Sequence, residues 1–413
     1  MKSICLCFHV HQPVRLRRFR FFDIGISDDY YDEYKNKSII QRVARESYLP
    51  TNKIILKLIQ KYQDRFKVAF SISGTAIDQF MNYAPEVIES FKELAATGCI
   101  EFIAETYPHS LAAIIDQEEF REQVITHSKA IETLFGKKPA VFSNTGLIYS
   151  DEIGAVVAEL GFEAMIAEGP KQILKWRSPN YLYSNVIDPS IAILLRNDML
   201  SDDIAFRFSN TNWSGWPLTA KKYVSWLKKI PKHEEIVNLF MDYETFGERQ
   251  KADTGIFDFL ESLPLMVFRK SDFKFMTPSE VVNHHDCISV LNMPHAGSNA
   301  DQERDMSAWL GNNLQQEAFE NIYKLSKMID QDTSPALLRD WQYLQSSDHF
   351  YYMSTKYYDD GAVHASQNPY DSPYEAFLNY LNVLNDFSIR LDWEIKIRNN
   401  VNYEVNKTHI HFI

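Results

Sequence analysis

Residues 236–248 read Ile-Val-Asn-Leu-Phe-Met-Asp-Tyr-Glu-Thr-Phe-Gly-Glu, an apolar run that ends in three carboxylates. The run Ile236–Met241 has the length and apolar character of a strand that is buried on both faces. Because side chains alternate along a strand, Asp242 and Glu244 are expected to leave its end on the same side. Buried carboxylates are costly unless they are hydrogen-bonded or solvated in a cleft. The stretch therefore indicates a polar site at a strand end, with a charged surface loop as the alternative.

Other short apolar runs have the same character, and stretches with helical spacing or capping residues separate them. Strands that alternate with helices favour parallel βα units, and polar residues after several of the strands favour a barrel over a doubly wound sheet. The predicted strands are Ile4–Val10, Val68–Ile72, Ile100–Ala104, Ala140–Phe142, Ala164–Ala167 and Ile236–Met241, and the predicted helices between them are Asn52–Tyr62, Pro85–Thr97, Gln117–Phe135 and Ser150–Leu160.

The character of the chain changes near residue 285, which predicts three parts in its 413 residues. Residues 1–285 are expected to form the α/β barrel domain, and 286–392 a helical domain that completes the cleft. The short apolar segments Trp393–Ile397 and Thr408–Phe412 alternate in a β-like way on either side of Asn399 and Asn400, so 393–413 is predicted as a β-hairpin-like tail. The helices expected in the second part are Asn312–Ile329, Pro335–Ser346 and Ser372–Leu391.

Composition narrows the partners that the protein can have. The chain carries 43 Lys and Arg against 55 Asp and Glu, and its net charge of −12 repels nucleic acids and anionic membranes. The first residues lack the apolar core of a signal peptide, and four scattered cysteines form no disulfide framework, so a cytoplasmic location is expected. The aromatic share of 14% is consistent with a large core or with platforms for sugar rings. Oligomeric state cannot be read from the sequence.

Three further segments carry residues that are suited to chemistry. His9 and His11 end the first predicted strand on one face, either as structural histidines or as binding groups. Glu105 follows the third predicted strand, where it either faces a site or caps the next helix. Asp348 and His349 precede a run of aromatic residues, which suits one wall of a cleft as well as plain packing. A His-x-His pair alone supplies only two metal ligands, so no metal site and no cofactor are predicted.

Five motifs, in this order, resemble the α-amylase branch of glycoside hydrolase family 57. The resemblance implies an incomplete (β/α)7 barrel with a helical C-terminal domain, acting on α-1,4-glucans with retention through a Glu nucleophile and an Asp acid/base. It assigns the acid/base role to Asp242. The motifs are His11–Pro13, Ala104–Leu111, Phe142–Tyr149, Asp242–Glu248 and Ser347–Met353.

The chain departs from this family pattern at three positions. Gly146 stands where active relatives carry the nucleophilic Glu, Ser143 where Arg is usual, and Arg249 where His is common. Retaining glycosidases need two carboxyl groups roughly 5–5.5 Å apart, and a glycine supplies none. We therefore expect a void at Gly146 and the loss of the covalent step.

The sequence thus predicts an α-amylase-like scaffold that binds α-glucan or maltooligosaccharide with weak or absent hydrolysis. Two alternatives stay open. In the first, Glu105 or Glu244 replaces the nucleophile in an active amylase or 4-α-glucanotransferase. In the second, the protein is a metal-dependent deacetylase or mannosidase on a similar barrel. The residues predicted to bind substrate are His9, His11, Gln12, Glu105, His109, Glu244, Asp348 and His349.

Overall fold

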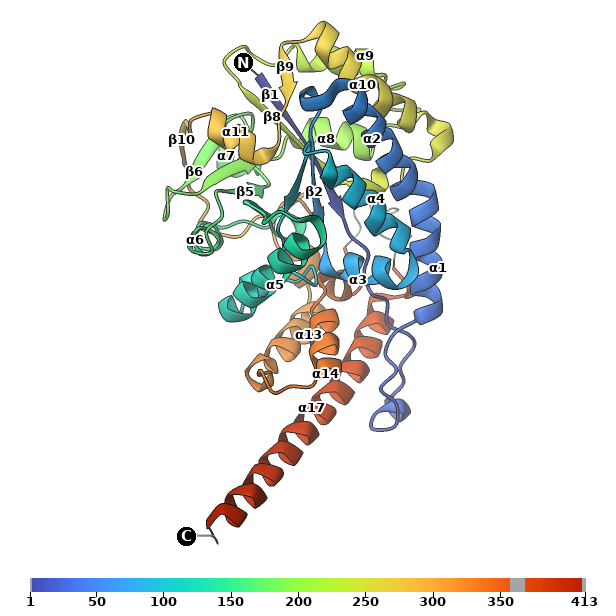
Figure 1. The fold of residues 1–413 in the computed structure, drawn as a ribbon, viewed down its shortest axis with the longest axis vertical. Helices are drawn as coiled ribbons and strands as arrows, with labels where there is room; N and C mark the ends of the chain where they lie inside the picture. Colours follow the sequence, from blue (N-terminus) through green and yellow to red (C-terminus); the bar gives the residue numbers. More distant parts are fainter. Residues whose placement is uncertain (1, 357–367, 411–413) are drawn as a thin grey trace.

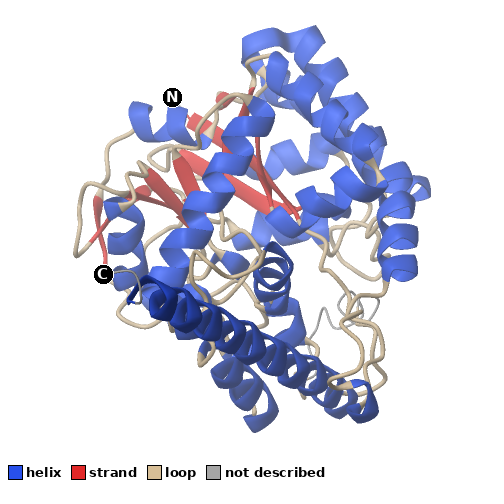
Figure 2. Ribbon diagram, turned by 60° about the horizontal axis from the view of Figure 1, so that its bottom comes forward, coloured by secondary structure: helices blue, strands red, loops and turns tan. Residues whose placement is uncertain are grey.

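The computed structural model describes residues 2–356 and 368–410, with the backbone alone beyond residue 399. Strands occupy the middle of the molecule and helices surround them (Figure 2). The strands are β1 Lys2–Val10, β2 Val68–Ile72, β3 Ile100–Ile103, β4 Val141–Ser143, β5 Ala164–Ala167, β6 Leu182–Asn185, β7 Ala192–Leu195, β8 Ile236–Asp242, β9 Phe273–Phe275 and β10 Ser289–Leu291.

The strands form two five-stranded sheets. In the first sheet the order is β3-β2-β1-β8, with β9 also paired to β1, and in the second it is β10-β6-β7-β5-β4. All pairs are parallel except β6 with β7. The six predicted strands are present, and β6, β7, β9 and β10 are additional.

Two isolated bridges bring the sheets together in the order of a barrel. One joins Ala104 to Phe142 beyond β3, and the other joins Arg196 to Asn238 beyond β7; both are parallel. Seven parallel strands thus follow one another as β1-β2-β3-β4-β5-β7-β8, but two seams replace a continuous ladder, so no closed barrel exists. The predicted α/β class with an incomplete barrel is confirmed in this form.

Strand alternation brings polar side chains to one end of this ring. Cys5 and Cys7 point inward from β1 and are fully buried in a small apolar cluster to which both sheets contribute. His9 is the next residue on that inward face. Four other strands follow the same pattern, because the residue two positions after an inward-facing apolar residue is polar and also faces inward. These polar residues are Ser71, Glu105, Ser143 and Asp242, which follow Ala69, Ile103, Val141 and Phe240.

Helices cover the outside of the ring, and the C-terminal ones pack below the second sheet (Figure 1). The outer face of the first sheet packs on helices from both ends of the barrel part, including α2, α4 and α10. The helices are α1 Glu33–Val43, α2 Leu49–Tyr62, α3 Gly74–Tyr83, α4 Pro85–Ala96, α5 Gln117–Phe135, α6 Asp151–Glu159, α7 Lys171–Leu174, α8 Asp198–Ala205, α9 Ala220–Leu227, α10 Ile256–Lys270, α11 Pro278–His284, α12 Ser307–Leu310, α13 Asn313–Tyr323, α14 Pro335–Leu344, α15 Ser347–Tyr351 and α17 Pro373–Ile410.

The predicted β-hairpin-like tail is wrong. Residues 393–410 continue α17, which runs for 38 residues and projects beyond the other helices (Figure 1). The apolar residues at 393, 395 and 397 imitate a strand, but Ile395 packs on the core while Trp393 and Ile397 are exposed. An i,i+4 ion pair between Asp392 and Lys396 supports the helix there. Residues 411–413 lie outside the described part of the chain.

The expected boundary near residue 285 stays a prediction. The chain after that point starts with β10, which pairs with β6 of the second sheet, before the C-terminal helices begin. Among the described residues, no helix combines the length and the apolar character that a membrane span needs.

Asp386 anchors α17 and offers a test of this packing. Its carboxylate, 1% exposed, accepts hydrogen bonds from the Tyr30 hydroxyl and the Gly25 N–H at 2.5 Å each, and lies 3.2 Å from Nε of Arg390. We predict that Asp386→Ala lowers the free energy of unfolding by about 3 kcal/mol, because it leaves buried partners unpaired. The matched control is Asp392→Ala on the same helix, a half-exposed residue whose loss is expected to change stability by less than about 0.5 kcal/mol. Equal losses in urea titrations of the two variants would contradict the anchoring role.

Candidate functional site

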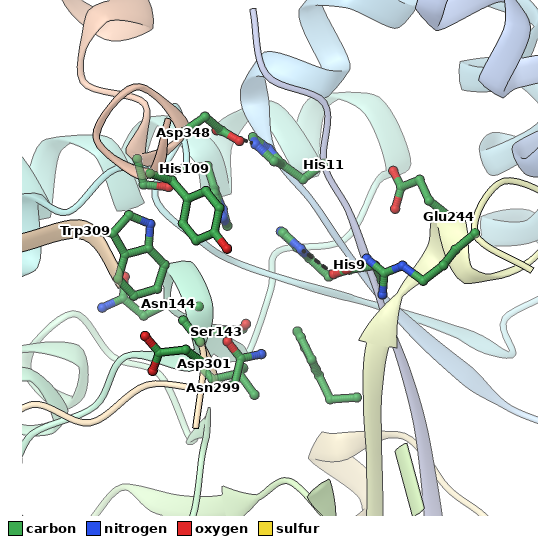
Figure 3. A pocket seen from close by; sticks show the side chains of 18 of the residues that line it. His9, His11, His109, Ser143, Asn144, Glu244, Asn299, Asp301, Trp309 and Asp348 are labelled. Carbon is green, nitrogen blue, oxygen red and sulfur yellow. Dashed lines mark hydrogen bonds and ion pairs between the residues drawn. The ribbon is translucent and has the colours of Figure 1, made fainter. Parts of the chain in front are cut away.

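A cavity of about 170 Å³ opens at the carboxyl end of the strand ring. Figure 3 shows His9, His11 and Glu244 on one side of it and Ser143, Asn144, Asn299, Asp301 and Trp309 on the other. The lining residues are His9, His11, His109, Ser143, Asn144, Gly146, Leu147, Phe206, Phe240, Asp242, Glu244, Arg249, Asn299, Ala300, Asp301, Trp309, Ser347, Asp348, Tyr351 and Tyr352.

Most of the predicted site residues meet at this cavity. His9, His11, His109, Gly146, Asp242, Glu244 and Asp348 line it. Gln12, Glu105 and His349 do not reach its surface. The His349 ring is buried against Tyr380, and its Nε2 lies 3.1 Å from the Tyr343 carbonyl oxygen, so its contacts are those of a packed side chain. A substrate-binding role for these three residues stays a prediction.

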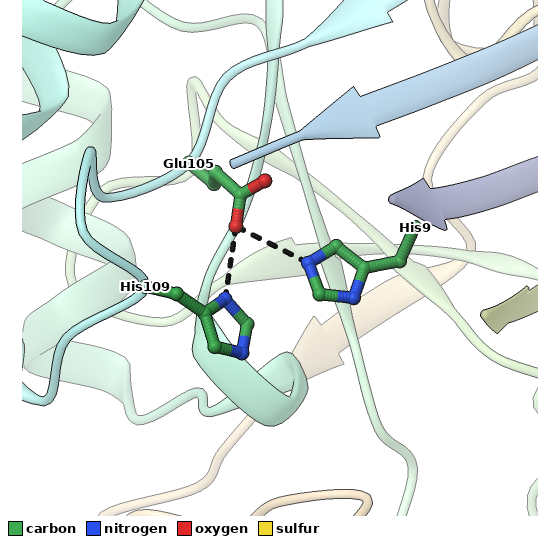
Figure 4. A group of neighbouring side chains, drawn as sticks. All are labelled: His9, Glu105 and His109. Carbon is green, nitrogen blue, oxygen red and sulfur yellow. Dashed lines mark hydrogen bonds and ion pairs between the residues drawn. The ribbon is translucent and has the colours of Figure 1, made fainter. Parts of the chain in front are cut away.

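Glu105 lies beneath the cavity at 1% exposure and organises two histidines (Figure 4). Its Oε2 is 3.3 Å from Nε2 of His9 and 3.0 Å from Nδ1 of His109, and Oε1 accepts a hydrogen bond from Ser71 at 3.1 Å. Burial alone would raise the pKa of Glu105, but the charge of His9 and the hydrogen bond from His109 hold it well below its ordinary value. Burial and the neighbouring His11 lower the pKa of His109 to about 4.

His9 connects Glu105 to Asp242. Its Nδ1 lies 3.6 Å from Oδ1 of Asp242, and Arg249 donates to Oδ2 of the same carboxylate at 2.8 Å. Burial opposes charge on His9, yet Glu105 and Asp242 raise its pKa to about 10. Burial would also raise the pKa of Asp242, but Arg249 and His9 hold it well below its ordinary value. The four groups form an alternating chain of charge, Glu105⁻, His9⁺, Asp242⁻ and Arg249⁺.

The remaining ionisable groups on this side are also paired. His11 bonds to Ser73 through Nδ1 and to Asp348 through Nε2, both at 2.8 Å. Burial would raise the pKa of Asp348, but His11 holds it well below its ordinary value. We call the wall built from His9, His11, Asp242, Arg249 and Asp348 the charged wall.

Glu244 has its own buried partners. It is 5% exposed and accepts hydrogen bonds from the Tyr48 hydroxyl and, at 3.4 Å, from the Gln12 amide. Burial and the charge of Asp242 raise its pKa. Glu105 and Glu244, the two proposed substitutes for the missing nucleophile, are therefore both held by other side chains.

No void exists at Gly146, which corrects the expectation from sequence. Gly146 has a left-handed φ of +54°, and a Cβ placed on it would lie 2.4 Å from Cη2 of Trp309. The Oδ1 atom of Asn299 would be 3.5 Å away. The next residue, Leu147, is also left-handed at φ +53°, which is rare without glycine. The indole ring thus occupies the space into which a nucleophilic side chain would grow.

The cluster of His9, Glu105 and His109 supplies the third metal ligand that the sequence lacked. One ligand atom from each lies within 4.8 Å of the others, and His2Glu is a ligand set that zinc uses. As placed, both imidazoles point at the same oxygen of Glu105, and these hydrogen bonds complete the cluster without a cation. The distances between His9, Glu105 and His109 therefore do not favour a metal site over a hydrogen-bonded cluster.

Sequence reasoning missed the residues of the opposite wall. Asn299, Asp301 and Trp309 come from 288–311, a segment that reads only as loop. Phe206 and Phe240 were also missed, but they lie beside Arg249 and His9, and Phe240 belongs to the predicted strand that leads to Asp242. The one available signal is the tryptophan itself, a large apolar residue in a polar loop. Burial raises the pKa of Asp301 to about 6, although Lys356 lies 3.3 Å away.

A profile of the family described as "Glycosyl hydrolase family 57" matches residues 5–294. The chain belongs to glycosyl hydrolase family 57. It is 41% identical over 392 residues to a protein of Methanocaldococcus jannaschii that is provisionally named an alpha-amylase, and the match covers 92% of this chain and 83% of that protein.

Solved structures, one of them described as a family 57 enzyme, share the fold of this chain. A branching enzyme from Thermococcus kodakaraensis superposes with a TM-score of 0.67 at 14% identity, covering 94% of this chain and 90% of that one. A 4-alpha-glucanotransferase from Thermococcus litoralis gives 0.58 at 15% identity. The match covers 92% of this chain but only 55% of the glucanotransferase, so this chain spans about half of that protein's length.

The contact between Gly146 and Trp309 predicts a specific stability effect in this family 57 chain. Gly146→Ala is expected to lower the free energy of unfolding by about 2–4 kcal/mol, because strain at a left-handed position adds to overpacking against the indole. Gly136→Ala is the matched control, since Gly136 is also left-handed at φ +76° but has open space where a Cβ would lie. It is expected to lose only about 1 kcal/mol. Equal losses in denaturant titrations of the two variants would show that the ring contact does not constrain position 146.

The Glu105–His9 pair predicts an unusual titration. His9 should stay protonated at neutral pH and titrate near 10, so the stability it contributes is complete below its unfolded value of about 6.5 and is lost as pH rises through 10. In Glu105→Gln the strongest charge that raises the pKa of His9 is gone, and titration should move toward the ordinary value. The Cε1–H resonance of His9 followed by NMR is the measurement, and a wild-type midpoint near 6.5 would contradict the pairing.

Proposed function

We propose that this family 57 protein binds α-glucan chains in the cavity and does not hydrolyse them by the family's retaining route. The observation that carries the proposal is Gly146, where no carboxylate stands and the Trp309 ring fills the space. A retaining mechanism needs a carboxylate on that face of the anomeric carbon to form the covalent intermediate. The nearest polar side chain to that position, Asn299, is neutral and a poor substitute for a carboxylate.

The state of Asp242 supports the same conclusion. A general acid must hold a proton near the working pH, and glycosidases raise the pKa of that carboxyl group. Here Arg249 and His9 flank Asp242 and hold its pKa below the ordinary range. Asp242 is thus an ionised hydrogen-bond acceptor that suits sugar hydroxyls better than it suits protonation of a leaving group.

The substitute-carboxylate alternative draws less support from the structure. Glu105 is buried under two histidines, and Glu244 is bound by Tyr48 and Gln12. An inverting route would need a free carboxylate roughly 6.5–9.5 Å from its partner with a water between them. Moving either residue into that position would leave its present partners unpaired.

Several finer points belong to this proposal as predictions. The ligand class is an α-glucan or maltooligosaccharide, because the solved structures with a similar fold include a family 57 branching enzyme and a 4-alpha-glucanotransferase. Oligomeric state remains open, and a cytoplasmic location stays a prediction.

Binding and turnover should be measured on the same protein preparation. We expect titration calorimetry to detect maltopentaose binding, while reducing-sugar release from it stays about 10⁴-fold or more below that of an active family member. Asp242→Ala serves as the control for turnover, because any genuine family-type hydrolysis must disappear with it. Robust hydrolysis that Asp242→Ala abolishes would sink the non-hydrolytic proposal, and absence of maltooligosaccharide binding would sink the binding proposal.

A further inference from the structure

Residues 297–309, which we call the covering segment, are clamped onto the loop that carries Gly146. Gly297 and Tyr149 exchange two backbone hydrogen bonds at 3.0 Å, and the Asn299 N–H donates to the Gly146 carbonyl at 2.8 Å. Arg304 donates to the Asn299 carbonyl at 2.6 Å and lies 3.9 Å from buried Glu168. The position of the segment, and of Trp309 at its end, is therefore fixed by the fold.

Trp309 and Gly146 fit each other. Trp309 is 6% exposed, and it lines the cavity. Its six-membered ring lies so close to Gly146 that any other residue there would displace it. Glycine at 146 is thus required by the present packing of the indole and is more than the absence of a nucleophile.

Three polar groups at this ring are available to bind a ligand. The Ser143 hydroxyl, the Asn299 side-chain amide and the Trp309 indole N–H line the cavity, and none has a hydrogen-bond partner among residues 2–356 and 368–399. In the described part of the chain these three groups are not fully buried, so a ligand in the cavity can reach each of them. We call Ser143, Asn299 and Trp309 the neutral wall (Figure 3).

The two walls differ in what they can offer a ligand. On the charged wall, His9 and Asp242 are already held in ion pairs and His11 is hydrogen-bonded to Asp348, so a sugar hydroxyl there competes with a charged partner. On the neutral wall, donors and acceptors are free, and an aromatic ring stands beside them. Neutral polar groups around the part of an indole ring that reaches the cavity complement a glucosyl unit, which has apolar C–H faces and a rim of hydroxyls.

We infer that the neutral wall is the sugar-recognition surface of the cavity, with a glucosyl ring packed on Trp309 and its hydroxyls bound by Asn299 and Ser143. The inference rests on the proposed function and deepens it, because it names the residues that set affinity and the chemical class that they fit. The side of the cavity that holds the nucleophile in active relatives serves here as a binding surface.

The test compares maltopentaose affinity among variants of the full chain by titration calorimetry. Trp309→Leu is expected to weaken binding about tenfold, and Trp309→Phe, which keeps a ring, should recover part of the loss. Asn299→Ala removes one hydrogen bond and should weaken binding about fivefold. Trp176→Leu, which changes a 90% exposed tryptophan outside the cavity lining, is the matched control and should bind as the wild type does.

Fluorescence gives a second readout that does not depend on folding alone. Maltopentaose should change the tryptophan emission of the wild type and of Trp176→Phe, and the change should be lost in Trp309→Phe. If the wild type binds maltopentaose but Trp309→Phe and Asn299→Ala bind equally well and Trp309→Phe keeps the emission change, the inference is overturned while the proposed function stands. If the wild type binds no maltooligosaccharide, the proposed function fails, and the inference fails with it.

Discussion

The buried carboxylate of Glu105 is the constraint around which the site is built. At 1% exposure it is shielded from solvent, so it needs donors from the protein, and His9, His109 and Ser71 provide them. Once His9 carries charge to satisfy Glu105, its second nitrogen faces Asp242, and Arg249 completes the balance from the other side. One buried charge thus keeps His9 protonated, and protonated His9 helps to keep Asp242 ionised. This charge pattern affects the reaction, because the Asp242 carboxylate, held between two cations, does not work as a proton donor.

Strand pairing explains why these groups meet. Their strands lie far apart in sequence but next to each other in the ring, and a period of two brings each polar residue inward immediately after an inward apolar one. Sequence reasoning found this end of the ring because short buried runs followed by His, Glu or Asp are a strong local pattern. It predicted six strands and most of the charged wall for that reason.

The parts that sequence reasoning missed lack such a pattern. Trp309 contacts Gly146 across more than 160 residues of chain, and nothing in a polar loop indicates which wall its tryptophan joins. The strands β6, β7, β9 and β10 have three or four residues each, but β3, β4 and β5 are equally short and were predicted, so length alone does not explain why they were missed. The prediction for the tail, residues 393–413, was wrong for the opposite reason. Apolar residues at 393, 395 and 397 show a period of two by coincidence, whereas the ion pair and the packing of Ile395 that hold the helix act between turns and with distant residues.

The two walls belong largely to different sheets, and the seams between those sheets give this arrangement a mechanical meaning. His9 and Asp242 belong to the first sheet, and Ser143 belongs to the second. At the nearer seam, Ala104 joins the sheets through two backbone hydrogen bonds, to Val141 and from Ser143. At this seam the backbones of the two sheets are therefore joined by two bonds of about 1 kcal/mol each and not by a full ladder. A glucan that contacts both walls would link the two sheets across this seam, so that binding in the cavity would also make the barrel more rigid.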